Sequence, residues 1–198
     1  MSTLAGTKTL ENLMKAFAGE SQARNRYTYF ASIAKKEGFI QIEAIFLETA
    51  ENEKEHAKVY YKAIANGMGG ANEAIPIEIT ATYPVAYGNT FENLIAAAAG
   101  EHEEWSDLYQ NFANIAEHEG FKDVASSFRM IAKVENHHED RYLKLAENIK
   151  LGEVFSKEVS TAWKCGNCGY IHTGKDAPEL CPACKHPQAY FEVLCDNF

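Results

Sequence analysis

Apolar residues recur at intervals of three and four up to about residue 151, which is the periodicity of amphipathic helices. Glycines and prolines interrupt the pattern, so it predicts four long helices, over residues 9–36, 40–65, 90–118 and 121–150. The connections within each pair are short, whereas residues 66–89 form one long connection. Two short connections and one long crossover predict an all-α four-helix bundle of the ferritin-like topology. We expect the β-branched part of the crossover, residues 75–82, to run extended along the bundle.

The two helix pairs resemble copies of one unit. When the chain is shifted by 82 residues, FASIAKKEGF at residues 30–39 aligns with FANIAEHEGF at residues 112–121. Thirteen of the 33 positions from Phe30 to Lys62 match, whereas composition alone predicts roughly two or three matches. The same shift pairs Glu53 with Glu135 and His56 with His138.

The repeat has one irregularity. AFAGE, ending at Glu20, matches AAAGE, ending at Glu101, with a shift of 81 instead of 82. The second half therefore carries one extra residue between Glu101 and Phe112. A single insertion in a continuous helix is most simply accommodated as a π-helical turn, and such turns occur often at functional sites. We predict a π-helical turn in this interval.

Each half of the repeat contains a Glu-x-x-His motif, Glu53 with His56 and Glu135 with His138. Residues three apart share one helix face, so each pair can point toward a single ion. The other two helices supply further carboxylates, which are Glu20, Glu101 and Glu104. Two Glu-x-x-His helices and two helices that each contribute a Glu are the ligand set of a carboxylate-bridged di-iron or di-manganese site in a bundle.

Electrostatics support the metal-site interpretation. Five carboxylates converging in a bundle core cannot all stay ionised without cations, because burying unpaired charge costs many kcal/mol. A single Glu-x-x-His motif is common on solvated helix faces, but two at equivalent positions of a repeat favour a metal site. Tyr27 and Tyr109 are candidates to hydrogen-bond ligand carboxylates, and packing in the core is the alternative role for both.

All five cysteines lie within the last 34 residues. Four of them form two C-x2-C knuckles separated by twelve residues, Cys165 with Cys168 and Cys181 with Cys184. This spacing predicts a tetrahedral four-thiolate site for zinc or for a single iron, and it does not choose between them. Cys195 is spare. We divide the chain into a bundle domain, residues 1–155, and a small β and loop domain, residues 160–198, that needs its metal to fold.

Composition limits the partners. With 19 basic and 28 acidic residues the formal net charge is −9, and no Lys/Arg run is present. Nucleic acid and anionic membranes are therefore poor partners, and small molecules are better ones. Residues 1–10 do not resemble a signal peptide, and the apolar run of residues 94–99 is too short to span a bilayer. We expect a cytoplasmic protein.

Taken together, the motifs resemble the rubrerythrin family over nearly the whole chain. The residues that carry the likeness are AFAGESQARNRY (16–27), ENEKEHA (51–57), AAGEHEE (98–104), VENHHEDRY (134–142), CGNCGY (165–170) and PELCPAC (178–184). The resemblance implies a ferritin-like di-iron bundle followed by a rubredoxin-like domain, and a non-haem iron peroxidase of oxidative-stress defence.

The resemblance also assigns ligands. The di-iron ligands fall on Glu20, Glu53, Glu101, Glu104, Glu135 and His138. One iron in the family exchanges a terminal glutamate for a histidine on reduction, which here would exchange Glu104 for His56. The third iron falls on Cys165, Cys168, Cys181 and Cys184.

The implied reaction is H2O2 + 2 electrons + 2 protons → 2 H2O, with Tyr27 and Tyr109 as candidate proton relays. Electrons would come from an external reductase or rubredoxin-type donor linked to a nicotinamide cofactor, through the four-cysteine iron. From His138 to the helix end near Lys150 is about 18 Å at 1.5 Å per residue. Because that separates the two sites within one chain, we expect a homodimer with electron transfer between subunits.

Two other classes of protein remain open. A ferroxidase, iron-storage protein or oxygen-reducing ferritin-like protein would use the same bundle but would not need a four-cysteine electron carrier. A zinc-ribbon interaction protein would use the cysteines but would leave the carboxylates of the bundle without a role.

Overall fold

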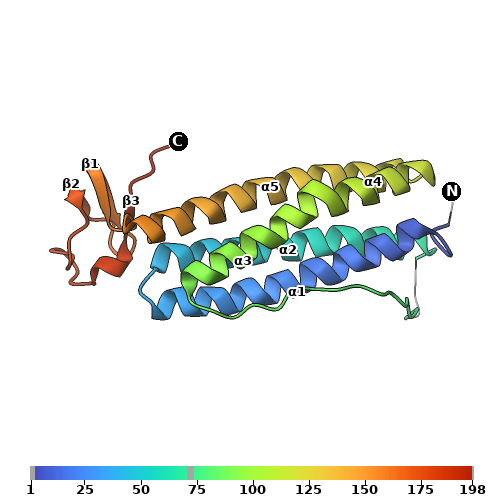
Figure 1. The fold of residues 1–198 in the computed structure, drawn as a ribbon, viewed down its shortest axis with the longest axis horizontal. Helices are drawn as coiled ribbons and strands as arrows, with labels where there is room; N and C mark the ends of the chain where they lie inside the picture. The colour runs from blue at the N-terminus through green and yellow to red at the C-terminus, as the bar shows by residue number, and fades with distance from the viewer. Residues whose placement is uncertain (1–2, 71–73, 198) are drawn as a thin grey trace.

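The computed structural model describes residues 3–70 and 74–197. It consists of a long helical bundle with a small sheet at one end (Figure 1). The helices are α1 (Lys8–Lys36), α2 (Ile40–Gly67), α3 (Thr90–Glu103), the π-helix η1 (Glu104–Leu108), α4 (Tyr109–His118) and α5 (Lys122–Leu151). The predicted four-helix bundle is confirmed, because α3, η1 and α4 together form its third long helix.

The helix ends follow local sequence signals. The Thr7 side chain accepts a hydrogen bond from the Leu10 amide at the start of α1. Asn89 and Glu92 form a reciprocal capping box at the start of α3. α5 ends at Gly152, whose φ of 69° lies in the left-handed region that glycine adopts most easily.

The predicted π-helical turn is confirmed. η1 occupies residues 104–108, inside the interval between Glu101 and Phe112 in which the repeat places its extra residue. The insertion therefore widens one turn of the helix and leaves the helices on either side in the register of the repeat.

The long crossover follows the bundle as expected. Its described residues, 74–89, form no helix or strand and run beside α1 toward the start of α3 (Figure 1). The Tyr83 hydroxyl donates a hydrogen bond to the backbone carbonyl of Lys15, at 2.9 Å, which attaches the crossover to α1.

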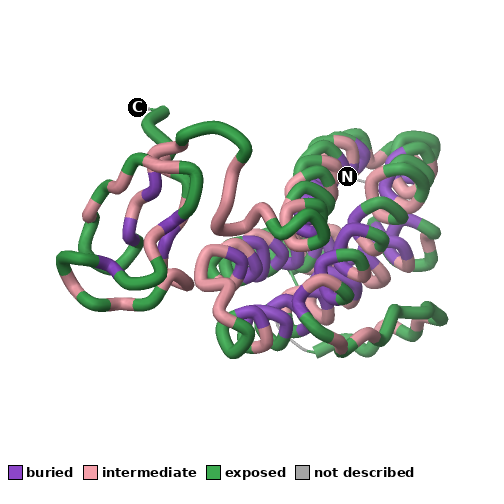
Figure 2. Tube along the Cα trace, turned by 60° about the vertical axis from the view of Figure 1, so that its left-hand side comes forward, coloured by how far each residue is buried: buried purple, intermediate pink, exposed green. Residues whose placement is uncertain are grey.

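Two apolar clusters fill the bundle and lie on either side of its buried carboxylates. One cluster contains Leu13, Tyr60 and Phe128, and the other contains Phe30 and Phe46. Along each long helix, the buried glutamate lies between residues of one cluster and residues of the other. Figure 2 shows the buried residues lining the inner faces of the helices. The carboxylates are therefore shielded from water by apolar side chains above and below them.

The small C-terminal unit is an antiparallel sheet with strand order β2-β1-β3. Its elements are β1 (Ser156–Cys165), β2 (Ile171–Asp176), the 3-10 helix η2 (Gln188–Tyr190) and β3 (Phe191–Val193). Its core consists of a few buried residues, including Trp163 and Phe191 together with two of the cysteines. Phe39 and Phe155 stack with ring centroids 6.3 Å apart, which joins this unit to the α1–α2 turn.

Within the described residues, none of the helices combines the length and apolar character needed to cross a membrane.

Candidate metal centres

The four long helices bring six of the predicted ligands together in the middle of the bundle. Glu20 comes from α1, Glu53 and His56 from α2, Glu101 from α3, and Glu135 and His138 from α5. All are buried except His56, whose side chain is 13% exposed. Their ligand atoms form two groups that could each hold a metal ion, Glu20/Glu53/His56/Glu135 and Glu53/Glu101/Glu135/His138.

Glu53 and Glu135 belong to both groups, and each directs one oxygen toward each histidine. His56 Nδ1 lies 2.9 Å from Glu53 Oε2 and 2.9 Å from Glu135 Oε1. His138 Nδ1 lies 3.2 Å from Glu53 Oε1 and 2.8 Å from Glu135 Oε2. A carboxylate that presents separate oxygens to two neighbouring groups has the geometry of a bridging ligand.

Two tyrosines hold the remaining carboxylates. The Tyr109 hydroxyl donates to Glu20 Oε1 at 2.6 Å, and the Tyr27 hydroxyl donates to Glu101 Oε1 at 2.5 Å. Tyr27 lies on the same helix face as Glu20, but its partner is the equivalent glutamate from the other half of the repeat. Each half of the repeat therefore orients a carboxylate of the other half.

Unpaired atoms test whether these residues fit metal ions. Among the described residues, Glu20 Oε2 and Glu101 Oε2 are buried with neither a hydrogen-bond nor an ion-pair partner. Glu53 Oε1, both Glu135 oxygens and His138 Nδ1 are buried with close contacts only to other members of the cluster. More than about 90% of buried polar groups in proteins have a hydrogen-bond partner. Unpaired carboxylate oxygens that converge with imidazole nitrogens fit two hard or borderline divalent cations.

The pKa values show what happens to this cluster when only protons balance its charge. Burial, and then the neighbouring carboxylates, raise the pKa values of Glu20 and Glu101 well above their usual range. Burial lowers the pKa values of both histidines, but bonds to Glu135 and Glu53 outweigh it and raise them to about 10 for His56 and about 9 for His138. Protons thus occupy the region where cations would sit, and metal binding must release them.

The structure does not bring Glu104 into either group. This half-buried residue begins η1, and its Oε1 lies 3.8 Å from where a Cβ on Gly19 would stand. Burial and the nearby Glu135 and Glu53 raise its pKa well above the ordinary value. In the register of the repeat, its counterpart in the first half is Ala23. Glu104 is thus the carboxylate that breaks the symmetry of the site.

One contact near the site was not predicted from the sequence. The Trp105 indole nitrogen donates to Glu139, which also lies 3.1 Å from His102 Nδ1. Trp105 and Glu139 directly follow Glu104 and His138, so this bond ties η1 to α5 beside the ligands. The one feature of the sequence that pointed to this contact was the position of Trp105 within the interval that carries the inserted residue.

The four predicted cysteine ligands also come together. Cys165 Sγ lies 3.7 Å from Cys184 Sγ, and Cys168 Sγ lies 3.7 Å from Cys181 Sγ. Four sulfurs bound at about 2.3 Å to one tetrahedral metal are about 3.8 Å apart, so the spacing fits a metal. A backbone hydrogen bond from His186 lowers the pKa of Cys184 to about 6, which favours the thiolate. Cys195 is exposed and lies outside this group.

The fold and the two centres define a ferritin-like dimetal carboxylate protein with an added four-thiolate unit. Comparison with known proteins agrees. The family model for rubrerythrin matches residues 11–146, and the model for the rubrerythrin rubredoxin-like domain matches residues 163–192. The chain is 59% identical to rubrerythrin-1 of Clostridium acetobutylicum and 51% identical to rubrerythrin of Nitratidesulfovibrio vulgaris, each over the full length of both chains.

Among solved structures, nigerythrin in a partially reduced state is similar with a TM-score of 0.63 and 34% identity, over 98% of this chain and 92% of that one. A bacterioferritin of Desulfovibrio desulfuricans, at 20% identity and a TM-score of 0.63, shares the fold over 74% of this chain and 82% of that one.

The chain belongs to the rubrerythrin family of di-iron proteins. The carboxylate and histidine groups are those of the rubrerythrin di-iron site, and the four cysteines form the cluster of the rubredoxin-like domain.

Proposed function

We propose that this protein is a peroxidase that reduces hydrogen peroxide to water: H2O2 + 2 electrons + 2 protons → 2 H2O. The observation that carries the proposal is the pairing, in one chain, of two metal-ligand groups that share Glu53 and Glu135 with a four-thiolate group suited to one-electron transfer. A two-electron reaction at the paired site and one-electron resupply from the thiolates account for both centres.

In this proposal Glu20, Glu53, Glu101, Glu135 and His138 would hold the two metals, and Glu53 and Glu135 belong to both ligand groups. His56 and Glu104 would be alternative ligands of one metal. Cys165, Cys168, Cys181 and Cys184 hold the third iron. When bound, the two ferrous ions supply the two electrons that the reaction consumes and a point of attachment for oxygen.

The residues of the chain supply protons and exclude water. Burial first, and then nearby carboxylates, raise the pKa values of Tyr27 and Tyr109 well above the ordinary value, so both keep their hydroxyl protons and hold Glu101 and Glu20 in place. Tyr27 and Tyr109, which bond ligand carboxylates and retain their hydroxyl protons, are the candidate proton relays. The apolar clusters on both sides limit water at the site.

We propose an external NAD(P)H-linked reductase or rubredoxin-type protein as the electron source, and the cytoplasm as the location. Helix α5 continues from His138 to Leu151, which separates the centres by about 18 Å or more at 1.5 Å per residue. A homodimer in which one subunit's thiolate iron serves its partner's di-iron site would shorten that path. Accordingly, residues 1–155 and 160–198 are proposed as the two functional domains.

Metal analysis and single-turnover kinetics test the proposal. We expect about three iron ions per chain, two for the paired groups and one for the thiolates. The reduced protein should be oxidised much faster by H2O2 than by O2. Faster oxidation by O2, with ferric iron accumulating beyond the two sites, would instead indicate a ferroxidase, and zinc in the thiolate site would exclude the electron-carrier role.

Mixed dimers test the assembly. Combining a Cys165→Ser chain with a Glu53→Ala chain places one intact thiolate site opposite one intact dimetal site. Recovery of peroxide turnover in isolated mixed dimers is expected. Its absence, with both parent sites loaded, would refute transfer between subunits.

A further inference from the structure

A cavity of about 240 Å³ lies between the crossover and the candidate dimetal site. Its walls come from three parts of the chain: Gly19 and Arg26 on α1, Thr80 to Pro84 on the crossover, and the helical stretch that carries Glu104 and Tyr109. Tyr109 is hydrogen-bonded to Glu20. The cavity therefore reaches residues that contact or supply the metal ligands.

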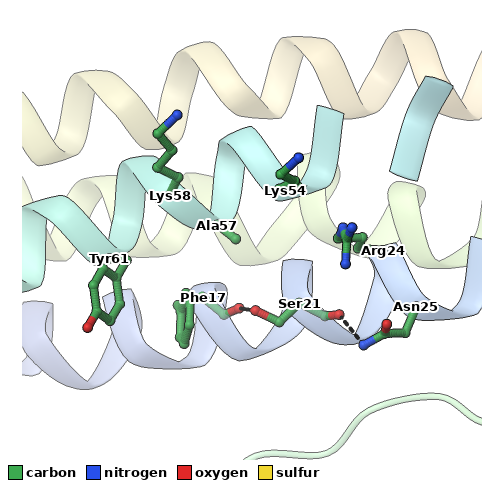
Figure 3. Close-up of a pocket in the computed structure, with 8 residues that line it drawn as sticks. All are labelled: Phe17, Ser21, Arg24, Asn25, Lys54, Ala57, Lys58 and Tyr61. Carbon is green, nitrogen blue, oxygen red and sulfur yellow. Dashed lines mark hydrogen bonds between the residues drawn. The ribbon is translucent and has the colours of Figure 1, made fainter. Parts of the chain in front are cut away.

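A larger groove on the outside of α1 and α2 does not have this property. Figure 3 shows it lined by Phe17, Ser21, Arg24, Asn25, Lys54, Ala57, Lys58 and Tyr61, none of which is a candidate ligand. Lys54 and Lys58 are paired with Glu51 and Glu55. The cavity beneath the crossover is thus the better candidate for a route to the dimetal site.

Tyr83 and Gly19 both line this cavity and lie close to each other. A Cβ placed on Gly19 would lie 3.6 Å from Tyr83 Cε1 and 3.8 Å from Glu104 Oε1. Gly19 therefore lies next to both the tyrosine ring and the carboxylate, and it places no side chain between these two groups. The Tyr83 hydroxyl is held by the Lys15 carbonyl at 2.9 Å, which fixes the ring over this gap.

The cavity also has a polar wall suited to a small hydrogen-bonding molecule. Arg26 is only 9% exposed, and its Nε and Nη1 have no hydrogen-bond partner among the described residues. Its Nη2 lies 3.5 Å from where a Cβ on Gly100 would stand. Arg26 and Glu104 both line the cavity, so its wall carries a guanidinium that can donate hydrogen bonds and a carboxyl that can accept them from a peroxide.

We propose that this cavity is the entry and binding site for the hydroperoxide, and that Tyr83 and Gly19 restrict it to small hydroperoxides. The inference rests on the proposed function and names the determinant of its substrate class. For any hydroperoxide the reaction is ROOH + 2 electrons + 2 protons → ROH + H2O. The O–O bond breaks, the donor-reduced iron supplies the electrons, and the size of R decides whether the molecule reaches the site.

Two substitutions with opposite effects test the restriction. Tyr83→Ala should raise the rate with tert-butyl hydroperoxide about tenfold relative to the rate with H2O2, because it removes the wall. Gly19→Ala should lower kcat/KM for H2O2 several-fold without changing kcat, since its new methyl group fits at ordinary contact distance but narrows the gap. Tyr83→Phe keeps the ring but removes its bond to the Lys15 carbonyl, so it should shift selectivity in the same direction as Tyr83→Ala and by a smaller factor. Tyr87→Ala is the matched control, because Tyr87 is on the same crossover, is 71% exposed and does not line the cavity.

Azide binding supplies a readout that does not need turnover. The on-rate of azide to the oxidised iron, followed by absorbance, should rise in Tyr83→Ala and fall in Gly19→Ala, and the double variant should return toward the parent rate. Azide on-rates and peroxide selectivity that stay within about twofold of the parent in both single variants would overturn the inference while the proposed function stands. Absence of H2O2 turnover in the parent would refute the proposed function and the hydroperoxide assignment with it, and azide rates that still respond to both substitutions would then show only that the cavity leads to the iron.

Discussion

Glu101→Gln should stabilise the metal-free protein while it abolishes a functional dimetal site. Glu101 is 1% exposed, and its Oε2 has no hydrogen-bond partner among the described residues. Burial, followed by the charges of Glu53 and Glu135, raises its pKa well above the ordinary value. A glutamine keeps an oxygen that can accept the Tyr27 hydrogen bond, and it carries no charge.

The sign of the effect follows from linkage. A carboxyl whose pKa is higher in the folded than in the unfolded state destabilises the folded protein once the pH exceeds the unfolded pKa of about 4.3. The loss of unfolding free energy grows with pH until the folded pKa is reached. The metal-free parent should therefore lose stability between about pH 5 and pH 8, and Glu101→Gln should lose less. Each pH unit above the unfolded pKa, up to the folded pKa, costs about 1.4 kcal/mol, and the glutamine avoids this cost because it does not titrate.

Urea unfolding followed by helical circular dichroism measures this. With a slope of about 2 kcal/mol/M, a gain of about 2 kcal/mol moves the midpoint by about 1 M at pH 8. Glu103→Gln, an exposed residue on the same helix, is the control and should not shift the midpoint. The reasoning is refuted when metal-free Glu101→Gln is less stable than the parent at pH 8, or when its gain is the same at pH 5 and pH 8.

Three further predictions follow from single contacts. Tyr27→Phe and Tyr109→Phe should each lower the stability of the metal-free bundle by about 1–3 kcal/mol, because each removes the hydrogen-bond donor to an equivalent buried carboxylate. Urea midpoints measure both losses, and a large difference between the two variants would contradict the equivalence of the two carboxylates. Gly152→Ala should lower the free energy of unfolding by about 1–2 kcal/mol, because Gly152 has a left-handed φ of 69°. Thermal unfolding measures the loss. Gly6→Ala is the reference, because Gly6 also has a left-handed φ, of 76°, and the comparison separates an effect at the end of α5 from a general effect of left-handed backbone. Cys181→Ser should remove one iron per chain and unfold the small sheet, while the dimetal site keeps its metal. Elemental analysis measures the iron, and fluorescence of the buried Trp163 reports the unfolding of the sheet. An unchanged iron content would show that the site does not require four thiolates.

The sequence predicted the helices closely because their ends have local causes. The capping box at Asn89 and the positive-φ glycines at the turns are read without knowing the packing. The π-helix was predictable for a different reason, since the shift between repeat copies changes by one residue between Glu101 and Phe112.

Contacts between helix pairs were harder to predict. Helical spacing placed Tyr27 near Glu20, but its hydrogen bond goes to Glu101, because the partner depends on how the pairs pack. The contact between Tyr83 and Gly19 could not be predicted, because Tyr83 lies in the crossover, where the hydrophobic residues have no regular spacing from which to infer a packing face. The position of Glu104 outside both ligand groups depends on the wider turn in which it stands.

The single-residue insertion at η1 has a consequence for the two metals themselves. A duplicated unit alone would generate equivalent metal positions with equal affinities and equal reduction potentials. The inserted turn lies directly beside Glu104, whose counterpart in the other half of the repeat is Ala23. Because only one half supplies this extra carboxylate, the two metal positions have different surroundings, and we expect the two ions to differ in affinity and reduction potential.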